Sequence, residues 1–248
     1  MLSVIYSLHS IAKFLYRKFS NVQLSTSNSS SLLPHSYTAD FNKEEELDTL
    51  YNFIQQYGFG TLIAVHPDSN VPVASHIPFL IDKQTGEYGE LIAHVARNNE
   101  IYKYLSTNSE VLVIFHGPHG YISPQFYLPS HINVPTWNYA NVHVYGKAIL
   151  DTPSGIPPQD VMNDLINFYE EKYMTTMWNW SDYYTPEALL SQRKSIVGFR
   201  IRITRIYGKY KLSQNKTRDI QKQVIHGLKN TNQLDIAAFM ENYLEKDD

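Results

Sequence analysis

Apolar and polar residues alternate with a period of two in several short stretches of the chain, which is typical of half-buried β-strands. Residues 59 to 66 and 71 to 81 show this pattern on either side of a turn-forming Pro-Asp-Ser-Asn sequence at 67 to 70. The sequence therefore predicts a β-hairpin over residues 59 to 81. In its second arm, Ser75 is the one polar residue on an otherwise apolar face. Its hydroxyl is either satisfied within the core, which is the more common case, or contacts a ligand.

Further strands are predicted where the same alternation or a short apolar run returns. These stretches are residues 91 to 96, 111 to 116, 141 to 150 and 196 to 215. In the last stretch the apolar residues share one face, which we expect to point inward. They are Val197, Phe199, Ile201 and Ile203, and they alternate with the outward residues Arg200, Arg202 and Thr204.

Helices are predicted where apolar residues recur three or four positions apart. The segments are residues 42 to 57, 159 to 173, 216 to 229 and about 232 to 245, with a short helix starting at Glu100. In the second segment Val161, Leu165 and Phe168 are expected to face the core.

Short strands joined by turns, together with helices between and after them, favour a mainly β fold with flanking helices (α+β). The strands are expected to form a small antiparallel barrel with the helices packed outside. A parallel dinucleotide-binding fold is disfavoured because the chain has no GxGxxG and no Walker motif.

Residues 116 to 146 depart from these patterns because they hold prolines at 118, 124, 129 and 135. Proline removes a backbone donor and fixes φ, so this segment is predicted to be a long, stiff loop rather than a helix or central strand. The loop is also rich in aromatic residues, including Trp137 and Tyr139. Such a loop is expected to cover a ligand or to brace a second subunit.

The composition narrows the function. The 248 residues are 43% hydrophobic, which is enough to bury a core, and one main domain with appendages is expected. A net charge of -3 and a pI near 6.4 disfavour a global polyanion-binding surface. Because there is no cysteine, disulfides, thiolate metal sites and cysteine nucleophiles are excluded, which fits the reducing cytoplasm.

Residues 1 to 32 have no acidic residue and end in a serine-rich run. This composition is typical either of a flexible extension or of a signal that targets a mitochondrion or another organelle. The apolar part is too short and too interrupted to span a membrane.

Two groups of residues carry candidate chemistry. Arg97 is placed where a strand ends and a helix begins, so it could bind a phosphate beside free backbone N–H groups, or pair with a surface carboxylate. The pair His116 and His119, with other histidines, could bind a metal or haem. The pair lies in a proline-broken turn without an adjacent carboxylate, so backbone hydrogen bonds are the favoured use of these histidines.

Seven short motifs in order resemble the PaiB-like family of FMN-binding proteins and negative transcriptional regulators, which have a split-barrel fold. The motifs are VASHIPF (73 to 79), HVARNN (94 to 99), VIFHGPHGYISP (113 to 124), VPTWNY (134 to 139), VHVYG (142 to 146), IVGF (196 to 199) and GKYKLSQN (208 to 215). The resemblance divides the chain into an N-terminal extension (1 to 32), a split-barrel domain with C-terminal helices (33 to 240) and a charged tail (241 to 248).

The resemblance implies a homodimer that binds FMN in a cleft between its subunits. FMN needs cationic and hydroxyl groups for its phosphate, flat apolar groups for its ring and a few directed hydrogen bonds at the ring edge. By analogy with split-barrel flavoproteins, the implied cofactor-binding residues are Ser75, His76, His94, Val95, Ala96, Arg97, Trp137, Lys209 and Lys211. No catalytic residue and no metal site is assigned.

Three functions remain open from the sequence. The first is an FMN-binding regulator of transcription, as the resemblance implies. Because no helix-turn-helix pattern is found, direct nucleic-acid binding is left undecided. The alternatives are an FMN-dependent oxidoreductase of unknown substrate and a haem-binding split barrel.

Overall fold

The computed structural model describes residues 37–105, 110–127, 133–176 and 183–245. Contacts along the chain separate Met1–Tyr37 from Thr38–Asp248, and every described helix and strand lies in the second unit. The predictions made for residues 1 to 32 therefore fall outside the described residues. Among the described residues, no helix is long and apolar enough to cross a membrane.

The strands form one antiparallel sheet with the order β3-β2-β6-β7-β8-β5-β4, and β1 pairs with β8. Their bounds are β1 (Lys43–Glu44), β2 (Phe59–Val65), β3 (Pro72–Pro78), β4 (Leu80–Asp82), β5 (Glu90–Ala96), β6 (Glu110–Ile122), β7 (Thr136–Leu150) and β8 (Ile196–Lys211). The predicted hairpin over residues 59 to 81 is confirmed, because β2 and β3 pair from Phe59 opposite Pro78 to Val65 opposite Pro72.

The sheet closes into a barrel through β3 and β4, which are separated by Phe79 alone. β3 pairs with β2 at one end of the sheet order, whereas β4 pairs with β5 at the other end. One stretch of chain thus changes its partner at Phe79 and joins the two edges. Closure of this kind satisfies edge groups that an open sheet would leave exposed.

Alternate residues of the strands fill the barrel. The predicted inward residues of β8, namely Val197, Phe199, Ile201 and Ile203, are all buried. They join one apolar cluster with side chains from β2, β5, β6 and β7, such as Leu62. The mainly β, barrel-forming fold predicted from the sequence is confirmed.

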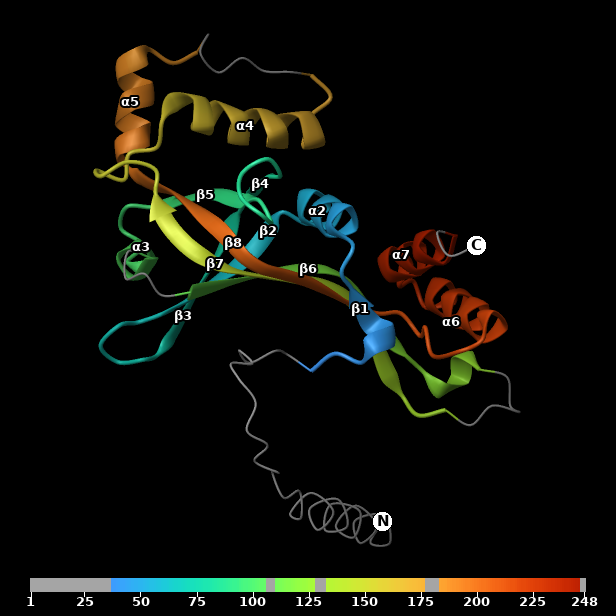
Figure 1. Ribbon diagram of the computed structural model, residues 1–248. Coiled ribbons are helices and arrows are strands. Elements are labelled where there is room, and N and C mark those ends of the chain that lie inside the picture. Colours follow the sequence, from blue (N-terminus) through green and yellow to red (C-terminus); the bar gives the residue numbers. More distant parts are fainter. Residues whose placement is uncertain (1–36, 106–109, 128–132, 177–182, 246–248) are drawn as a thin grey trace, which may run out of the picture. The chain divides into compact units, whose positions relative to one another are not determined.

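The helices flank this barrel (Figure 1). Their bounds are α2 (Leu47–Gln56), α3 (Ile101–Leu105), α4 (Gln159–Tyr173), α5 (Pro186–Lys194), α6 (Arg218–Asn230) and α7 (Leu234–Glu245), with short 3-10 turns η1 (Asp40–Asn42) and η2 (Pro124–Phe126). α6 and α7 pack against each other and against β6, beside the far ends of the long strands. On α4 the buried residues are Met162 and Leu165, so the inward face is rotated by about one residue from the prediction.

Two helices are fixed by particular contacts. Glu46 begins α2 because its carboxylate accepts hydrogen bonds from the backbone N–H groups of Asp48 and Thr49. α4 docks through Tyr169, whose hydroxyl donates to the carbonyl of Phe79 over 2.9 Å. Gly58 permits this approach, since a Cβ there would lie 2.6 Å from that hydroxyl.

The prediction of a long loop over residues 116 to 146 is wrong. β6 continues to Ile122 and β7 begins at Thr136, so most of the segment is a paired hairpin. Pro118 is tolerated because the pairing register shifts between His116 and His119, where a β-bulge needs no donor from it. Pro124 begins η2, and Pro129 lies outside the described residues.

Candidate functional site

Ser75 lies where the barrel closes. Its Oγ accepts a hydrogen bond of 2.9 Å from Nδ2 of Asn99, in the segment that follows β5. The Oδ1 of Asn99 accepts from the backbone N–H of Ile101 over 3.1 Å and so starts α3. The half-buried hydroxyl of Ser75 is therefore satisfied by the fold.

The guanidinium of Arg97 is held by backbone carbonyls. Nε donates to Lys194 over 2.7 Å, Nη2 to Ile196 over 2.8 Å and Nη1 to Ser154 over 3.3 Å. These bonds tie the end of β5 to the start of β8 and to the segment before α4. In this structure Arg97 acts as a brace, and its predicted contact with a phosphate stays a prediction.

The other predicted residues of β5 point to opposite sides of the sheet. Val95 is buried in the barrel, whereas Ala96 is exposed. His94 is half-buried on the outside, and its Nδ1 is buried with no hydrogen-bond partner among the described residues. Burial lowers the pKa of His94 because desolvation disfavours the charged imidazolium.

Trp137 and Lys211 lie together at the far end of the long strands. Nζ of Lys211 donates to the carbonyl of Trp137 over 2.6 Å and to Oγ1 of Thr136 over 2.7 Å. Burial lowers the pKa of this lysine. The indole of Trp137 is 53% exposed and meets the ring of Tyr121 edge-on, with the centroids 5.9 Å apart.

Side chains from five strands form a continuous surface on the outside of the barrel, here called the outer face. Residues directly opposite each other in an antiparallel sheet point to the same side, so the strand registers define this surface. Each of its residues is half-buried or exposed. They are Thr61, Ile63, His76, Leu112, Ile114, His116, Asn141, His143, Tyr145, Arg205, Tyr207 and Lys209.

The middle of the outer face holds interacting rings and cations. The guanidinium of Arg205 stacks on Tyr145 at 4.2 Å and pairs with Glu110 over 2.8 Å. Tyr207 donates to the hydroxyl of Tyr145 over 3.4 Å. Burial and this hydrogen bond raise the pKa of Tyr145 to about 12, so the phenol stays protonated at neutral pH.

The histidines of the outer face lie close enough to influence one another. Burial, followed by the nearby His119 and His76, lowers the pKa of His116. Burial, followed by His116 and Lys209, lowers the pKa of His143. A neutral imidazole can donate from one nitrogen and accept at the other, so these groups suit directed hydrogen bonds to a ligand. Within the described residues, no group of three or more potential ligands is arranged to hold a metal.

Several polar atoms beneath the outer face have no hydrogen-bond partner in the described part of the chain. They are Nε and Nη1 of Arg205, Nδ1 of His143 and Oδ1 of Asn141. Buried polar groups are almost always paired in folded proteins. A ligand or a second chain placed on the outer face would supply the missing partners.

The structure separates the predicted site residues into three places. The first place is the closure region, here meaning β3 and the end of β5, where the barrel closes. It holds Ser75, Val95, Ala96 and Arg97, with His94 nearby on β5. Trp137 and Lys211 lie at the far ends of β7 and β8. His76 and Lys209 lie on the outer face.

Sequence analysis missed Tyr145, Arg205 and Tyr207 as site residues. The sequence pattern that could have identified them is the period of two in β8. This pattern places Arg205, Tyr207 and Lys209 on the same outward side of the strand.

The outer face provides the chemistry that FMN requires. Arg205 and Lys209 supply positive charge for a phosphate, and Tyr145 and Tyr207 supply flat rings. His143 and Asn141 offer hydrogen bonds to a polar ring edge. When bound, FMN would supply electron-transfer chemistry that none of these side chains supplies alone.

The chain has relatives among known proteins. The chain is 35% identical over 215 residues to protease synthase and sporulation protein PAI 2 of Bacillus subtilis, covering 85% of this chain and 99% of that protein. It is 30% identical over 236 residues to an uncharacterized protein of Aspergillus fumigatus, covering 77% of this chain and 90% of the other.

A solved structure shares the fold. The FAD and heme binding protein from Mycobacterium smegmatis superimposes with a TM-score of 0.51 at 12% identity, covering 73% of this chain and 78% of that chain. Residues 36–205 match the family described as "Putative FMN-binding domain". This chain therefore belongs to that FMN-binding family and is a PaiB homologue with a split-barrel fold.

Proposed function

We propose that two copies of this chain form a homodimer through their outer faces and hold FMN there. The observation that carries the proposal is the set of unpaired buried polar atoms on Arg205, His143 and Asn141. His143 lies directly opposite the apolar, half-buried Ile114, and the half-buried Ile63 is on the same face. A surface that is both apolar and rich in unsatisfied polar groups suits a buried interface that contains a polar ligand.

In this proposal the phosphate lies near Arg205 and Lys209, and His76 and His143 contact the ring edge. The residues of the closure region, Ser75 and His94 to Arg97, stay candidates from the sequence resemblance. The fold already engages the guanidinium of Arg97 with three carbonyls. Arg205, whose Nε and Nη1 lack partners among the described residues, is therefore the stronger phosphate candidate.

Absorption spectroscopy and FMN titration test the cofactor. Protein purified after expression with excess riboflavin is expected to show flavin absorbance, and added FMN is expected to raise the melting temperature, because a ligand that binds only the folded state stabilises it. Replacing Arg205 with Gln is expected to weaken FMN binding by about tenfold or more. The control is Lys222→Gln, which removes an exposed positive charge on α6, outside the outer face. A Soret band without flavin absorbance would instead support the haem alternative.

Light scattering after size-exclusion chromatography tests the dimer. Ile114→Asp introduces a charge into the proposed interface and is expected to yield monomers. Val134→Asp is the control, because Val134 is 76% exposed and lies off the outer face. A wild-type chain that remains monomeric with FMN bound would contradict the proposed interface.

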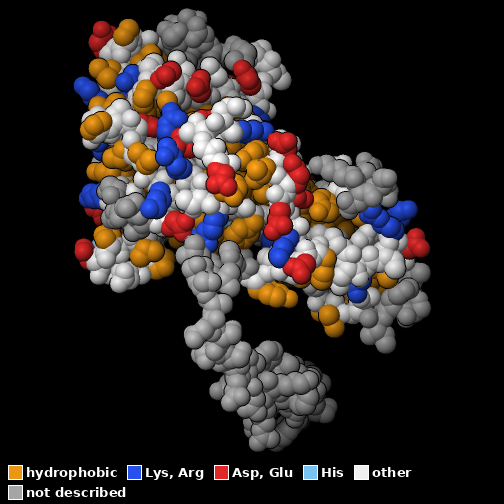
Figure 2. All heavy atoms as spheres, viewed as in Figure 1, with side chains coloured by type: hydrophobic (Ala, Val, Ile, Leu, Met, Phe, Trp, Pro, Cys, Tyr) orange, Lys and Arg blue, Asp and Glu red, His pale blue; other side chains and the backbone are white. Residues whose placement is uncertain are grey.

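We further propose that the protein acts on transcription through a partner rather than by direct contact with DNA. The basic residues around α6 are partly engaged: Lys229 pairs with Glu241 over 2.6 Å, and Lys216 donates to Asn133 over 2.6 Å. On the face shown in Figure 2, acidic and basic side chains are interspersed rather than gathered by sign. Duplex binding normally needs a concentrated basic surface.

A gel shift tests this proposal. DNA from upstream of the protein's own gene is expected to show no shift with the pure protein at low salt. A shift that weakens with salt and disappears in Lys222→Glu would establish direct binding and contradict the indirect route.

A further inference from the structure

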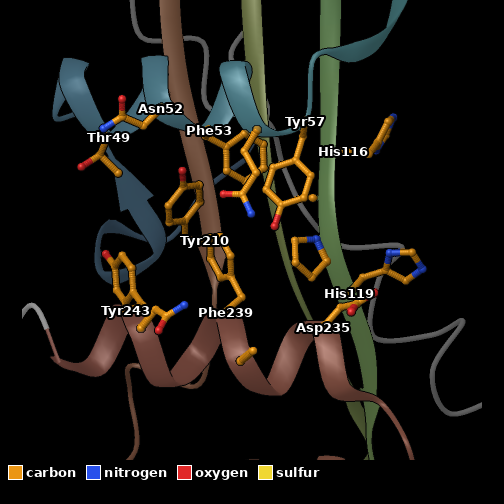
Figure 3. Close-up of a pocket in the computed structure, with 15 residues that line it drawn as sticks. Thr49, Asn52, Phe53, Tyr57, His116, His119, Tyr210, Asp235, Phe239 and Tyr243 are labelled. Atoms are coloured by element: carbon orange, nitrogen blue, oxygen red, sulfur yellow. The ribbon is translucent and has the colours of Figure 1, made fainter. Parts of the chain in front are cut away.

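A cavity of about 800 Å³, separate from the outer face, lies between α2, the bulge of β6 and α7 (Figure 3). Its walls are largely aromatic and include Phe53, Tyr57, Tyr210, Phe239 and Tyr243, and Asp235 borders it at the start of α7. The volume is within the range of small-molecule sites. Of the residues that the structure describes, only His116 belongs to both this cavity and the outer face.

Tyr210 gives this cavity a polar group on an otherwise buried side chain. Tyr210 is 1% exposed and packs between Phe53, Phe239 and Tyr243 at centroid distances of 5.4, 5.5 and 5.7 Å. In the described part of the chain its hydroxyl has no hydrogen-bond partner, although the residue borders the cavity. Burial raises the pKa of Tyr210, so the group remains a neutral phenol that can donate to a ligand in the cavity.

The charged side chains that line the cavity indicate which charge a ligand would carry. Among the described residues that line it there is no lysine or arginine, Asp235 is the one carboxylate, and His116 and His119 are the two imidazoles. Among the described residues Asp235 has no ion-pair or hydrogen-bond partner, and it acts electrostatically on Tyr57. Aromatic faces and a carboxylate attract cations, whereas the phosphate of FMN would meet no lysine or arginine here.

The carboxylate of Asp235 and the hydroxyl of Tyr210 lie at different levels along the axis of α7. Asp235 precedes Phe239 by four residues, and Phe239 precedes Tyr243 by four, so the axis rises about 6 Å at each step. Tyr210 packs against the later two rings. A ligand that reaches both polar groups therefore needs about the length of one aromatic ring with a short chain.

We propose that this cavity binds a small organic cation, with its ammonium group beside Asp235 and Tyr57 and with an aromatic body that carries a distal hydroxyl against Tyr210. The ammonium group donates to the carboxylate, and the distal hydroxyl pairs with the phenol of Tyr210. The proposal does not depend on FMN or on dimerisation, because none of the phosphate candidates lines the cavity.

Calorimetric titration of the full-length protein with three matched probes tests the site. Tyramine carries the ammonium and the hydroxyl, phenethylamine carries the ammonium alone, and 3-(4-hydroxyphenyl)propionate carries a carboxylate instead. We expect tyramine to bind more tightly than phenethylamine and the propionate to bind at least about tenfold more weakly than tyramine. Equal binding of the propionate, or no binding of any probe at millimolar concentration, would overturn the proposal.

Two variants separate the contributions. Asp235→Asn is expected to weaken both amines by about tenfold. Asp219→Asn is the matched control, because Asp219 is also exposed in the first turn of a helix but lies outside the cavity. Tyr210→Phe removes only the unpaired hydroxyl, and we expect it to reduce tyramine affinity to that of phenethylamine. Unchanged tyramine binding in Asp235→Asn, with the fold verified by its melting temperature, would also overturn the proposal.

Discussion

The Nδ2 of Asn99 donates to the Oγ of Ser75 over 2.9 Å, and this bond joins β3 to the segment after β5 where the barrel closes. We expect Ser75→Ala to lower the free energy of unfolding by about 1 kcal/mol, because Asn99 then loses its acceptor in a part-buried place. Urea unfolding of the flavin-free protein measures this change, with Ser191→Ala on the exposed side of α5 as the control. Unchanged stability with a much weaker FMN affinity would show instead that Ser75 is a cofactor ligand.

Arg97→Lys should destabilise the protein before any cofactor is present. A lysine cannot satisfy the carbonyls of Ser154, Lys194 and Ile196 with the fixed geometry of a guanidinium. The expected loss is about 1 to 3 kcal/mol, measured by chemical denaturation without FMN. If the flavin-free variant is as stable as the wild type but binds FMN poorly, the phosphate role predicted from the sequence is the correct one.

Stability should fall as the pH drops below about 6.5 because of His94. Burial lowers its pKa in the folded protein from the ordinary value of 6.5, so the unfolded chain binds the proton first. The contribution of neutral His94 to the free energy of unfolding is complete above the pKa that it has in the unfolded chain. It is lost as the pH falls toward the pKa of the folded state, at a slope of at most about 1.4 kcal/mol per pH unit. Unfolding free energies at pH 8, 6 and 5 measure the slope. His94→Gln should reduce the slope of the unfolding free energy with pH. An unaltered slope would show that His143 or His116 causes most of this pH dependence.

Gly146→Ala should disturb the pairing of β7 with β8. The pairing register of these strands shifts between Tyr145 and Gly146, and an added Cβ would contact the backbone carbonyl of Arg202 too closely. A backbone atom cannot rotate away, so a loss of about 1 to 3 kcal/mol is expected. Thermal unfolding measures it, and the exposed neighbour Lys147→Ala serves as the control. A variant as stable as the wild type would mean that the bulge relaxes freely.

The sequence by itself determined the elements whose signals are local. The β2–β3 hairpin followed from alternation around a turn, and the inward residues of β8 followed from a period of two, because side-chain direction depends on neighbouring residues alone. Family motifs spread over most of the chain also identified the FMN-binding family.

Tertiary structure decided everything that depends on which strands become neighbours. Pro118 is accommodated because the bulge in β6 removes the need for its donor, so a segment predicted as a loop pairs as strands. The outer face combines His76 of β3 with Tyr207 of β8, and the aromatic cavity combines Phe53 of α2 with Phe239 of α7. Such sites follow from the order and register of strands and the docking of helices, which are set by long-range packing and leave no periodic signal in the chain.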